Sequence, residues 1–176
     1  IETLRYYLDH PEAAGQWLQR LGVQDVQRGH TNVLRIATSG MTLDLVADIC
    51  SQFAPILGTS PDPDMVLNNL DRFIAAARNP LSLGALFERD REALPPLLQI
   101  FAASQHLSDV LIHDAESFDL LRLTEGQPVT RETVVGDVVA EVSALDHDPA
   151  VLGALRRFKQ RETLRIAYGD IVREQP

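Results

Sequence analysis

Residues 154–172 read ALRRFKQRETLRIAYGDIV, and this stretch predicts one long, strongly basic helix. Its basic residues fall between positions 156 and 165, where Glu162 alone opposes them: Arg156, Arg157, Lys159, Arg161 and Arg165. Leu155, Phe158 and Ile166 recur at helical spacing, so we expect them to form the buried side. Steps of four place Arg157, Arg161 and Arg165 on one stripe, which is typical of a solvent-exposed face.

The basic helix has a second interpretation, in which its arginines pair with the carboxylates of an adjoining domain or hold a phosphate. Asp148-Pro149 gives the capping and first-turn signal for its start. If the helix continues from Pro149 to about Val172, it is about 35 Å long at 1.5 Å per residue. Thr130 is expected to cap the preceding helix, Arg131 to Leu145, where valines recur in helical register.

Apolar residues at three- and four-residue steps continue toward the N-terminus, and strand-like alternation is scarce. Ser60-Pro61-Asp62-Pro63-Asp64 predicts a capped entrance to the helix Met65 to Ala77. Ser104 is expected to cap another helix, and Gly29 to interrupt a weaker one over 23–37. The sequence therefore predicts an all-α protein, an irregular bundle of about eight or nine helices that ends in a long basic helix.

Composition excludes several classes of protein. The chain has 176 residues and a formal net charge of −9, which argues against nucleic-acid binding. No apolar run approaches the roughly 20 residues that span a bilayer, so we expect no membrane partner. Cys50 is the single cysteine, which rules out an internal disulfide and favours a cytoplasmic location. Because the chain starts at Ile1 and stops at Pro176 after a charged run, we expect a fragment of a longer protein.

A search for chemistry yields no catalytic, cofactor-binding or metal-ligating residue. Phosphate-binding and dinucleotide glycine motifs are absent from the sequence. His106 and His113 are seven apart, too far along one helix to share an ion, so we interpret them as surface residues. Asp62 and Asp64 could be drawn as a metal-binding pair, but capping is the favoured interpretation. Cys50 is expected to be a small buried apolar residue and not a nucleophile.

Three segments, in this order and spacing, resemble the glutamine synthetase adenylyltransferase family. They are SPDPDMVLNNLDRF (60–73), FAASQHLSDVLIHDAESFDLL (101–121) and ALRRFKQRETLRIAYGDIV (154–172). Members of this bifunctional family add AMP to a tyrosine of glutamine synthetase and remove it again. The resemblance covers the last two-thirds of the chain well and the first sixty residues poorly. It implies a single helical domain, 1–176, with weaker N-terminal helices over 1–58 and a family-like core over 59–176.

The resemblance also defines what these residues lack. The family's catalysis uses a glycine-rich turn followed by an Asp-x-Asp strand that holds magnesium and ATP, and this sequence contains no such pattern. We therefore expect Mg and ATP to belong to the parent enzyme and no cofactor to bind this fragment. The implied partners are the adjoining nucleotidyltransferase domain, glutamine synthetase and the PII regulatory protein. The N-terminal half of the parent, which removes AMP, is the half we favour.

Two other classes of function stay open on the sequence. A free-standing helical adaptor would bind a protein partner through the final helix, and its gene would be about as long as this chain. A small helical enzyme that binds metal or nucleotide would bind zinc or ATP–magnesium in a calorimetric titration. Within the resemblance, the residues expected at an interdomain or partner contact are the five basic residues of 156–165.

Overall fold

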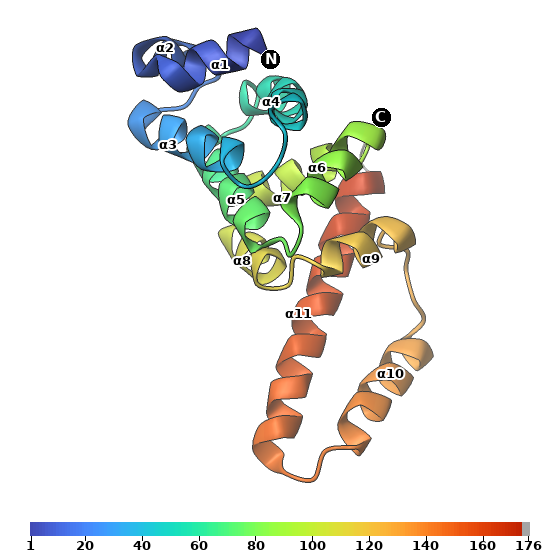
Figure 1. The fold of residues 1–176 in the computed structure, drawn as a ribbon. Helices are drawn as coiled ribbons and strands as arrows, with labels where there is room; N and C mark the ends of the chain where they lie inside the picture. Colours follow the sequence, from blue (N-terminus) through green and yellow to red (C-terminus); the bar gives the residue numbers. More distant parts are fainter. Residues whose placement is uncertain (174–176) are drawn as a thin grey trace. The chain divides into compact units, whose positions relative to one another are not determined.

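The computed structural model describes residues 1–173, so Pro176 lies outside the described residues. Within that range the chain forms eleven helices and no strand (Figure 1). The all-α prediction is therefore confirmed, and the number of helices is somewhat higher than expected. The additional helices come from short segments near Leu4, Leu81 and Phe118, which form helices of 8, 10 and 8 residues.

The chain divides into two compact units, Ile1–Glu116 and Ser117–Pro176. The first unit contains α1 (Glu2–Asp9), α2 (Pro11–Arg20), α3 (Val26–Ala37), α4 (Leu43–Leu57), α5 (Pro63–Ala76), α6 (Pro80–Arg89), α7 (Leu94–Ala103) and α8 (Gln105–His113). The second contains α9 (Ser117–Thr124), α10 (Arg131–Ser143) and α11 (Asp148–Arg173).

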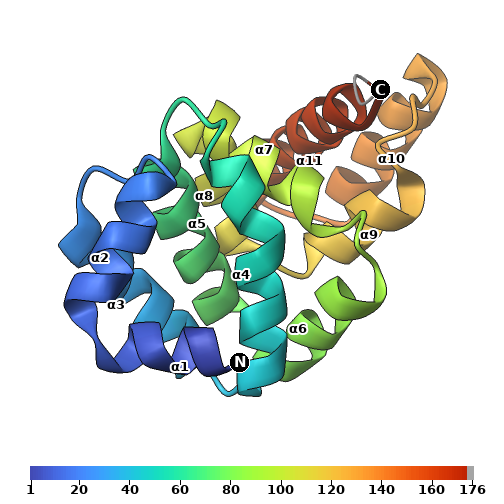
Figure 2. The same ribbon diagram turned by 90° about the horizontal axis from the view of Figure 1, so that it is seen from above.

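Helix α5 is the centre of the first unit. It contacts α3, α4, α6, α7 and α8, and Figure 2 shows these helices arranged around it. Its apolar residues are buried almost completely: Val66, Leu67, Leu70, Phe73 and Ile74. Farther along the unit, Trp17 stacks on Tyr7 at a ring-centroid distance of 5.2 Å and lies 6.0 Å from the ring of Phe53. Burial of these side chains supplies the main favourable term for folding of the unit.

Side-chain caps begin many of the helices. Three predicted caps are confirmed by hydrogen bonds from backbone N–H groups: Met65 N to Asp62 Oδ1 (2.9 Å), Leu107 N to Ser104 Oγ (3.3 Å) and Thr133 N to Thr130 Oγ1 (3.2 Å). The predicted cap at Asp148 is wrong, because Asp148 is already inside α11. His147 takes that role, since its Nδ1 accepts a hydrogen bond from Ala150 N at 3.2 Å.

The expected interruption at Gly29 is also wrong, because α3 runs without a break from Val26 to Ala37. Gly29 is buried at the packed side of the helix. A Cβ atom there would lie 3.0 Å from Val23 Cγ1 and 3.2 Å from Leu18 Cδ1. The glycine therefore allows α3 to pack closely against the end of α2, and this contact outweighs its weak helix propensity.

Asp64 has a structural role that its spacing from Asp62 did not indicate. Its carboxylate accepts hydrogen bonds from Gln24 N at 2.8 Å and Asp25 N at 2.9 Å. These two amides precede α3, so Asp64 on α5 ties the start of one helix to the start of another. Each of the two aspartates thus accepts from backbone amides, in agreement with the capping interpretation of the pair.

Asn69 is fully buried on α5 and belongs to a satisfied polar network. Asn69 and Gln105 exchange two side-chain hydrogen bonds, at 3.2 and 3.1 Å. Arg72 Nη1 donates to Asn69 Oδ1 at 3.1 Å and to Asp109 Oδ1 at 2.8 Å. The hydrogen bonds from Arg72 and Gln105 lower the pKa of Asp109 below its usual range. The network therefore joins α5 to α8 without leaving these groups unpaired.

The burial of Asp71, also on α5, is less favourable than that of Asn69. Its side chain is 3% exposed and lies 3.3 Å from the Nε atom of Arg35, whose own side chain is 59% exposed. Burial raises the pKa of Asp71, and the Arg35 charge lowers it by less. Removal from water thus disfavours the charged carboxylate more than its partner favours it.

We expect the free energy of unfolding of the wild type to fall, relative to that of Asp71→Asn, as the pH rises. Because the native pKa is raised, the folded state binds the proton more tightly than the unfolded state does. The advantage of the wild type over the variant is therefore full below the ordinary aspartate pKa of about 3.9 and is lost as the pH rises through the native pKa. Urea unfolding of both proteins between about pH 3 and pH 7 measures this. If the free energy of unfolding of the wild type instead increased with pH relative to that of Asp71→Asn, the raised pKa of Asp71 would be contradicted.

Candidate functional site

The basic stretch lies in a two-helix hairpin within the second unit. Residues 144–147 connect α10 to α11, and the two helices pack against each other. No residue of α10 is buried, and Val135 and Val139 are 47% and 51% exposed. The predicted helix with recurring valines is therefore present, but α11 covers only one of its sides.

A close backbone contact holds the start of this unit to α11. Gly126 has φ +59°, and a Cβ atom built on it would lie 2.5 Å from Gly169 Cα and 2.7 Å from Arg165 O. Gly169 shows the reciprocal crowding, because its Cβ would overlap Gly126 O. Arg165 Nη1 also donates to Gln127 O at 2.5 Å. The loop at 126–128 thus lies directly on the helix, which explains why α11 contains Gly169.

Two of the five predicted contact residues are already paired inside the unit. Arg161 Nη2 lies 2.5 Å from Glu141 Oε2 on α10. Arg165 donates from Nε and Nη2 to Glu162 Oε2, at 3.0 and 2.8 Å. The side chain of Arg165 is only 16% exposed, so the predicted exposed stripe is wrong at this residue, whereas Arg157 and Arg161 are exposed. Long arginine side chains can pack their stems against a neighbouring helix while the guanidinium remains paired.

The predicted buried side of α11 is also wrong, because α10 and the loop at 126–128 cover a different side of the helix. Leu155 and Ile166 are 40% and 51% exposed and Phe158 is half-buried, whereas Ala154, Leu164 and Tyr168 are buried. The side that carries Arg161 and Arg165 faces α10 and the loop at 126–128, so the helix is rotated relative to the prediction. The periodicity of apolar residues located the helix correctly, but it did not identify the side that its partner covers.

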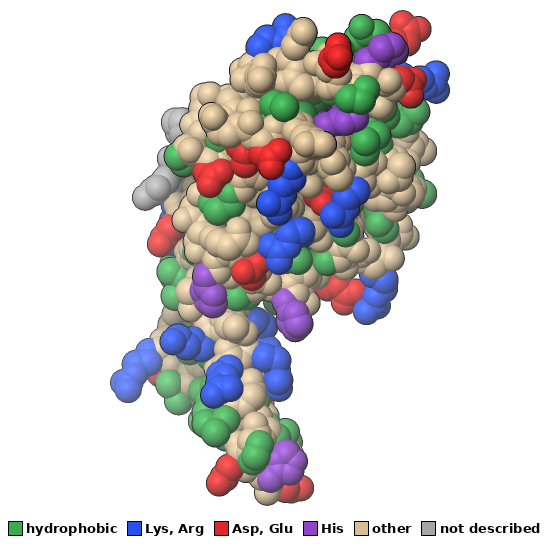
Figure 3. Space-filling model, turned by 90° about the vertical axis from the view of Figure 1, so that its left-hand side faces the viewer, with side chains coloured by type: hydrophobic (Ala, Val, Ile, Leu, Met, Phe, Trp, Pro, Cys, Tyr) green, Lys and Arg blue, Asp and Glu red, His purple; other side chains and the backbone are tan. Residues whose placement is uncertain are grey.

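The remaining three basic residues are exposed on more than one side of α11, because residues two apart in a helix, such as Arg157 and Lys159, do not share a face. Arg156, Arg157 and Lys159 are exposed, and they make no hydrogen bond or ion pair with any residue between 1 and 173. Leu152 and Leu155 lie within the same turns of α11 and are 55% and 40% exposed. Figure 3 shows Lys and Arg side chains beside hydrophobic ones over the hairpin. We call these five residues the basic patch of α11; such a mixture can bind an acidic surface that also presents apolar side chains.

The other residues considered in the sequence belong to the first unit. His106 and His113 are exposed on α8. Cys50 is buried, and burial raises the pKa of its thiol to about 12, so it is not activated as a nucleophile. The described part of the chain contains no group of three or more His, Cys, Asp or Glu side chains that could hold a metal ion. Among the helices within residues 1–173, none is long and apolar enough to cross a membrane.

Comparison with known proteins finds no matching family model, curated protein or solved structure. The fold and the basic patch therefore define only a broad class of protein. It is an all-helical protein whose last helix carries exposed basic residues with apolar neighbours.

Proposed function

We propose that this chain is a non-catalytic helical domain of a glutamine synthetase adenylyltransferase. That enzyme adds AMP to a tyrosine of glutamine synthetase, and removes it, in the regulation of nitrogen metabolism. In this proposal α11 is the connector to the catalytic nucleotidyltransferase domain. The ordered resemblance of the three segments 60–73, 101–121 and 154–172 supports the choice of parent enzyme.

The observation that carries the proposal is the basic patch of α11. Three exposed cations without a partner in the described residues and two exposed leucines occur within residues 152–159 of α11, in a chain whose net charge is −9. The negative charge of the rest of the chain disfavours a nucleic acid as the partner, which leaves a protein surface with carboxylates. The adjoining catalytic domain is the partner that the resemblance implies, and glutamine synthetase and PII are further partners in the same proposal.

Catalysis is assigned to the neighbouring domain and to none of the residues here. ATP and Mg would bind there, to the glycine turn and Asp-x-Asp strand that this sequence lacks. The parent acts on a cytoplasmic enzyme, so a cytoplasmic location belongs to the same proposal. This chain contributes by holding the catalytic domain in position, which affects the rate through alignment of the reacting groups.

The proposal predicts that Arg156→Glu with Arg157→Glu and Lys159→Glu impairs adenylyl transfer or removal in the complete enzyme. Reversal of three interface charges should lower the rate by about tenfold to a hundredfold, because each contributes roughly 0.5–1 kcal/mol. Arg161 is left unchanged because its ion pair with Glu141 joins α11 to α10, and Arg165 because it donates a hydrogen bond to Gln127 O. The measurement is AMP incorporation into, and release from, glutamine synthetase, with circular dichroism as a check of folding.

The matched control is Arg5→Glu with Arg20→Glu and Arg89→Glu. These three residues are exposed in the first unit, and their reversal changes the net charge by the same amount. We expect the control enzyme to keep wild-type activity. Equal losses in the two triple variants, or no loss in the basic-patch variant, would contradict the connector role.

The hairpin also fits the second candidate, a free-standing adaptor, because an unpaired basic patch can bind any suitable acidic protein. The gene distinguishes the two. A connector requires a glycine turn and an Asp-x-Asp motif encoded within about a hundred residues after position 176, the length of one domain. A stop codon soon after that position would favour the adaptor.

A further inference from the structure

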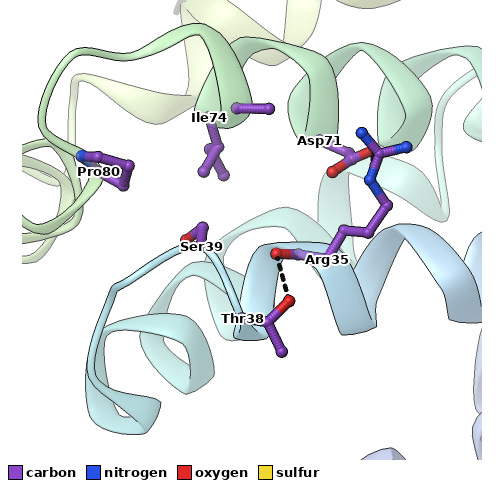
Figure 4. A pocket seen from close by; sticks show the side chains of 7 residues that line it. Arg35, Thr38, Ser39, Asp71, Ile74 and Pro80 are labelled. Atoms are coloured by element: carbon purple, nitrogen blue, oxygen red, sulfur yellow. Dashed lines mark hydrogen bonds and ion pairs between the residues drawn. The ribbon is translucent and has the colours of Figure 1, made fainter.

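A cleft of about 320 Å³ belongs to the first unit, whereas the basic patch belongs to the second. The cleft is formed by the end of α3, the connection to α4, the middle of α5 and the start of α6. Its lining consists of Arg35, Thr38, Ser39, Asp71, Ile74, Ala75 and Pro80. Figure 4 shows the α5 side chains facing those of the α3 end across this space. The volume is at the lower end of the range for small-molecule sites.

Two buried oxygen atoms of the lining have no hydrogen-bond partner in the described residues: Asp71 Oδ2 and Ser39 Oγ. Arg35 Nε lies 3.3 Å from Asp71 Oδ2 and forms an ion pair, but it does not donate a hydrogen bond to that atom. Buried polar atoms in folded proteins are nearly always hydrogen-bonded, and a buried carboxylate oxygen without a hydrogen bond is unfavourable. Both atoms therefore favour a bound group that donates hydrogen bonds.

We propose that this cleft binds a small primary organic ammonium ion, with Asp71 as its anionic partner. An ammonium group carries three donors and no acceptor, which suits an ionised carboxylate and a hydroxyl oxygen. The aliphatic part of the ligand would lie against Ile74, Ala75 and Pro80. An organic anion would instead approach the buried carboxylate with the wrong charge.

The environment of Asp71 favours an organic cation over a metal ion as the bound ligand. Arg35 is largely exposed and compensates the buried charge incompletely, as the raised pKa of Asp71 indicates. A second cation inside the cleft would replace the contact to Nε and allow Arg35 to turn into solvent. Asp71 is the one acidic residue among those that line the cleft, and a calcium or magnesium site needs several oxygen ligands.

Isothermal titration of the full 176-residue chain with n-butylammonium tests this inference. We expect saturable binding in the millimolar range, typical of a ligand with few heavy atoms, and no binding of n-butanol or butyrate. Asp71→Asn should weaken binding by about tenfold or more through loss of a charge-assisted hydrogen bond, and Ser39→Ala by a smaller factor. Arg35→Gln should retain or strengthen binding, because it removes the competing cation.

Asp48→Asn is the matched control. Asp48 is also a mostly buried carboxylate of the first unit, 18% exposed and paired with Arg91 at 2.6 Å, but it lies outside the cleft. This variant should bind n-butylammonium as the wild type does. Absence of saturable binding, equal binding by Asp71→Asn, or tighter binding of butyrate with loss in Arg35→Gln would each overturn the inference. Ser39→Ala provides an independent test if Asp71→Asn does not fold.

Discussion

Gly126→Ala is expected to unfold the second unit and leave the first unit folded. The new Cβ would collide with the backbone of Gly169, which cannot move aside as a flexible side chain could. Alanine is also disfavoured at the φ of +59° that this turn requires. The two effects together should destabilise the unit by about 3 kcal/mol or more, a large share of the stability of a small domain.

The two units can be followed separately because Trp17, the single tryptophan, lies in the first one. In the Gly126→Ala protein we expect a loss of helical circular dichroism at a temperature or urea concentration where Trp17 fluorescence is still native. Gly136→Ala is the control, because nothing lies within 4 Å of a Cβ built at this helical glycine. It should stabilise α10 by about 0.5–1 kcal/mol. A Gly126→Ala protein with wild-type unfolding curves would show that the contact with Gly169 does not hold the unit together.

Phe73→Ala is expected to have the complementary effect on the first unit. Phe73 of α5 is 1% exposed, and its ring meets that of Phe101 edge-on at a centroid distance of 5.8 Å. Loss of a buried phenylalanine side chain lowers the free energy of unfolding by about 3–5 kcal/mol. The native Trp17 fluorescence should therefore be lost at a clearly lower urea concentration than in the wild type.

Phe73→Leu is the matched control, because it keeps most of the buried apolar volume and should cost about 1.5 kcal/mol or less. If Phe73→Ala destabilised the protein no more than Phe73→Leu, the packing around α5 would not be the core of the unit. If Trp17 fluorescence and circular dichroism changed together in every variant, including Gly126→Ala, the two units would not unfold separately.

Local signals in the sequence were sufficient for the helices and many of their ends. Asp62, Ser104 and Thr130 act as caps because each bonds an amide three residues later, a relationship that the sequence itself contains. The effect of Gly29 could not be predicted in this way, because it depends on Val23 and Leu18, which pack against it only in the folded unit. Propensity describes an isolated helix, and tertiary contacts can outweigh it.

The functional residues were harder to predict from the sequence, because their roles also depend on tertiary contacts. The sequence placed five basic residues on one helix, but the division between Arg161, which binds Glu141, and the exposed Arg156 depends on how α10 packs. The cleft was not predicted at all, because Ser39 and Asp71 are far apart in the chain and Asp71 lies within an ordinary helical pattern. A charged residue on the apolar side of a predicted helix was the one available signal.

The most direct test of the proposed connector role is the affinity of this chain for the nucleotidyltransferase domain of the proposed parent enzyme. Titration of the separately expressed catalytic domain should give saturable binding that weakens with added salt, because exposed charges contribute to it. Arg156→Glu with Arg157→Glu and Lys159→Glu should reduce the affinity by about tenfold or more, and the Arg5, Arg20 and Arg89 control should not. No binding, or equal affinities for the wild type and the basic-patch variant, would contradict the account.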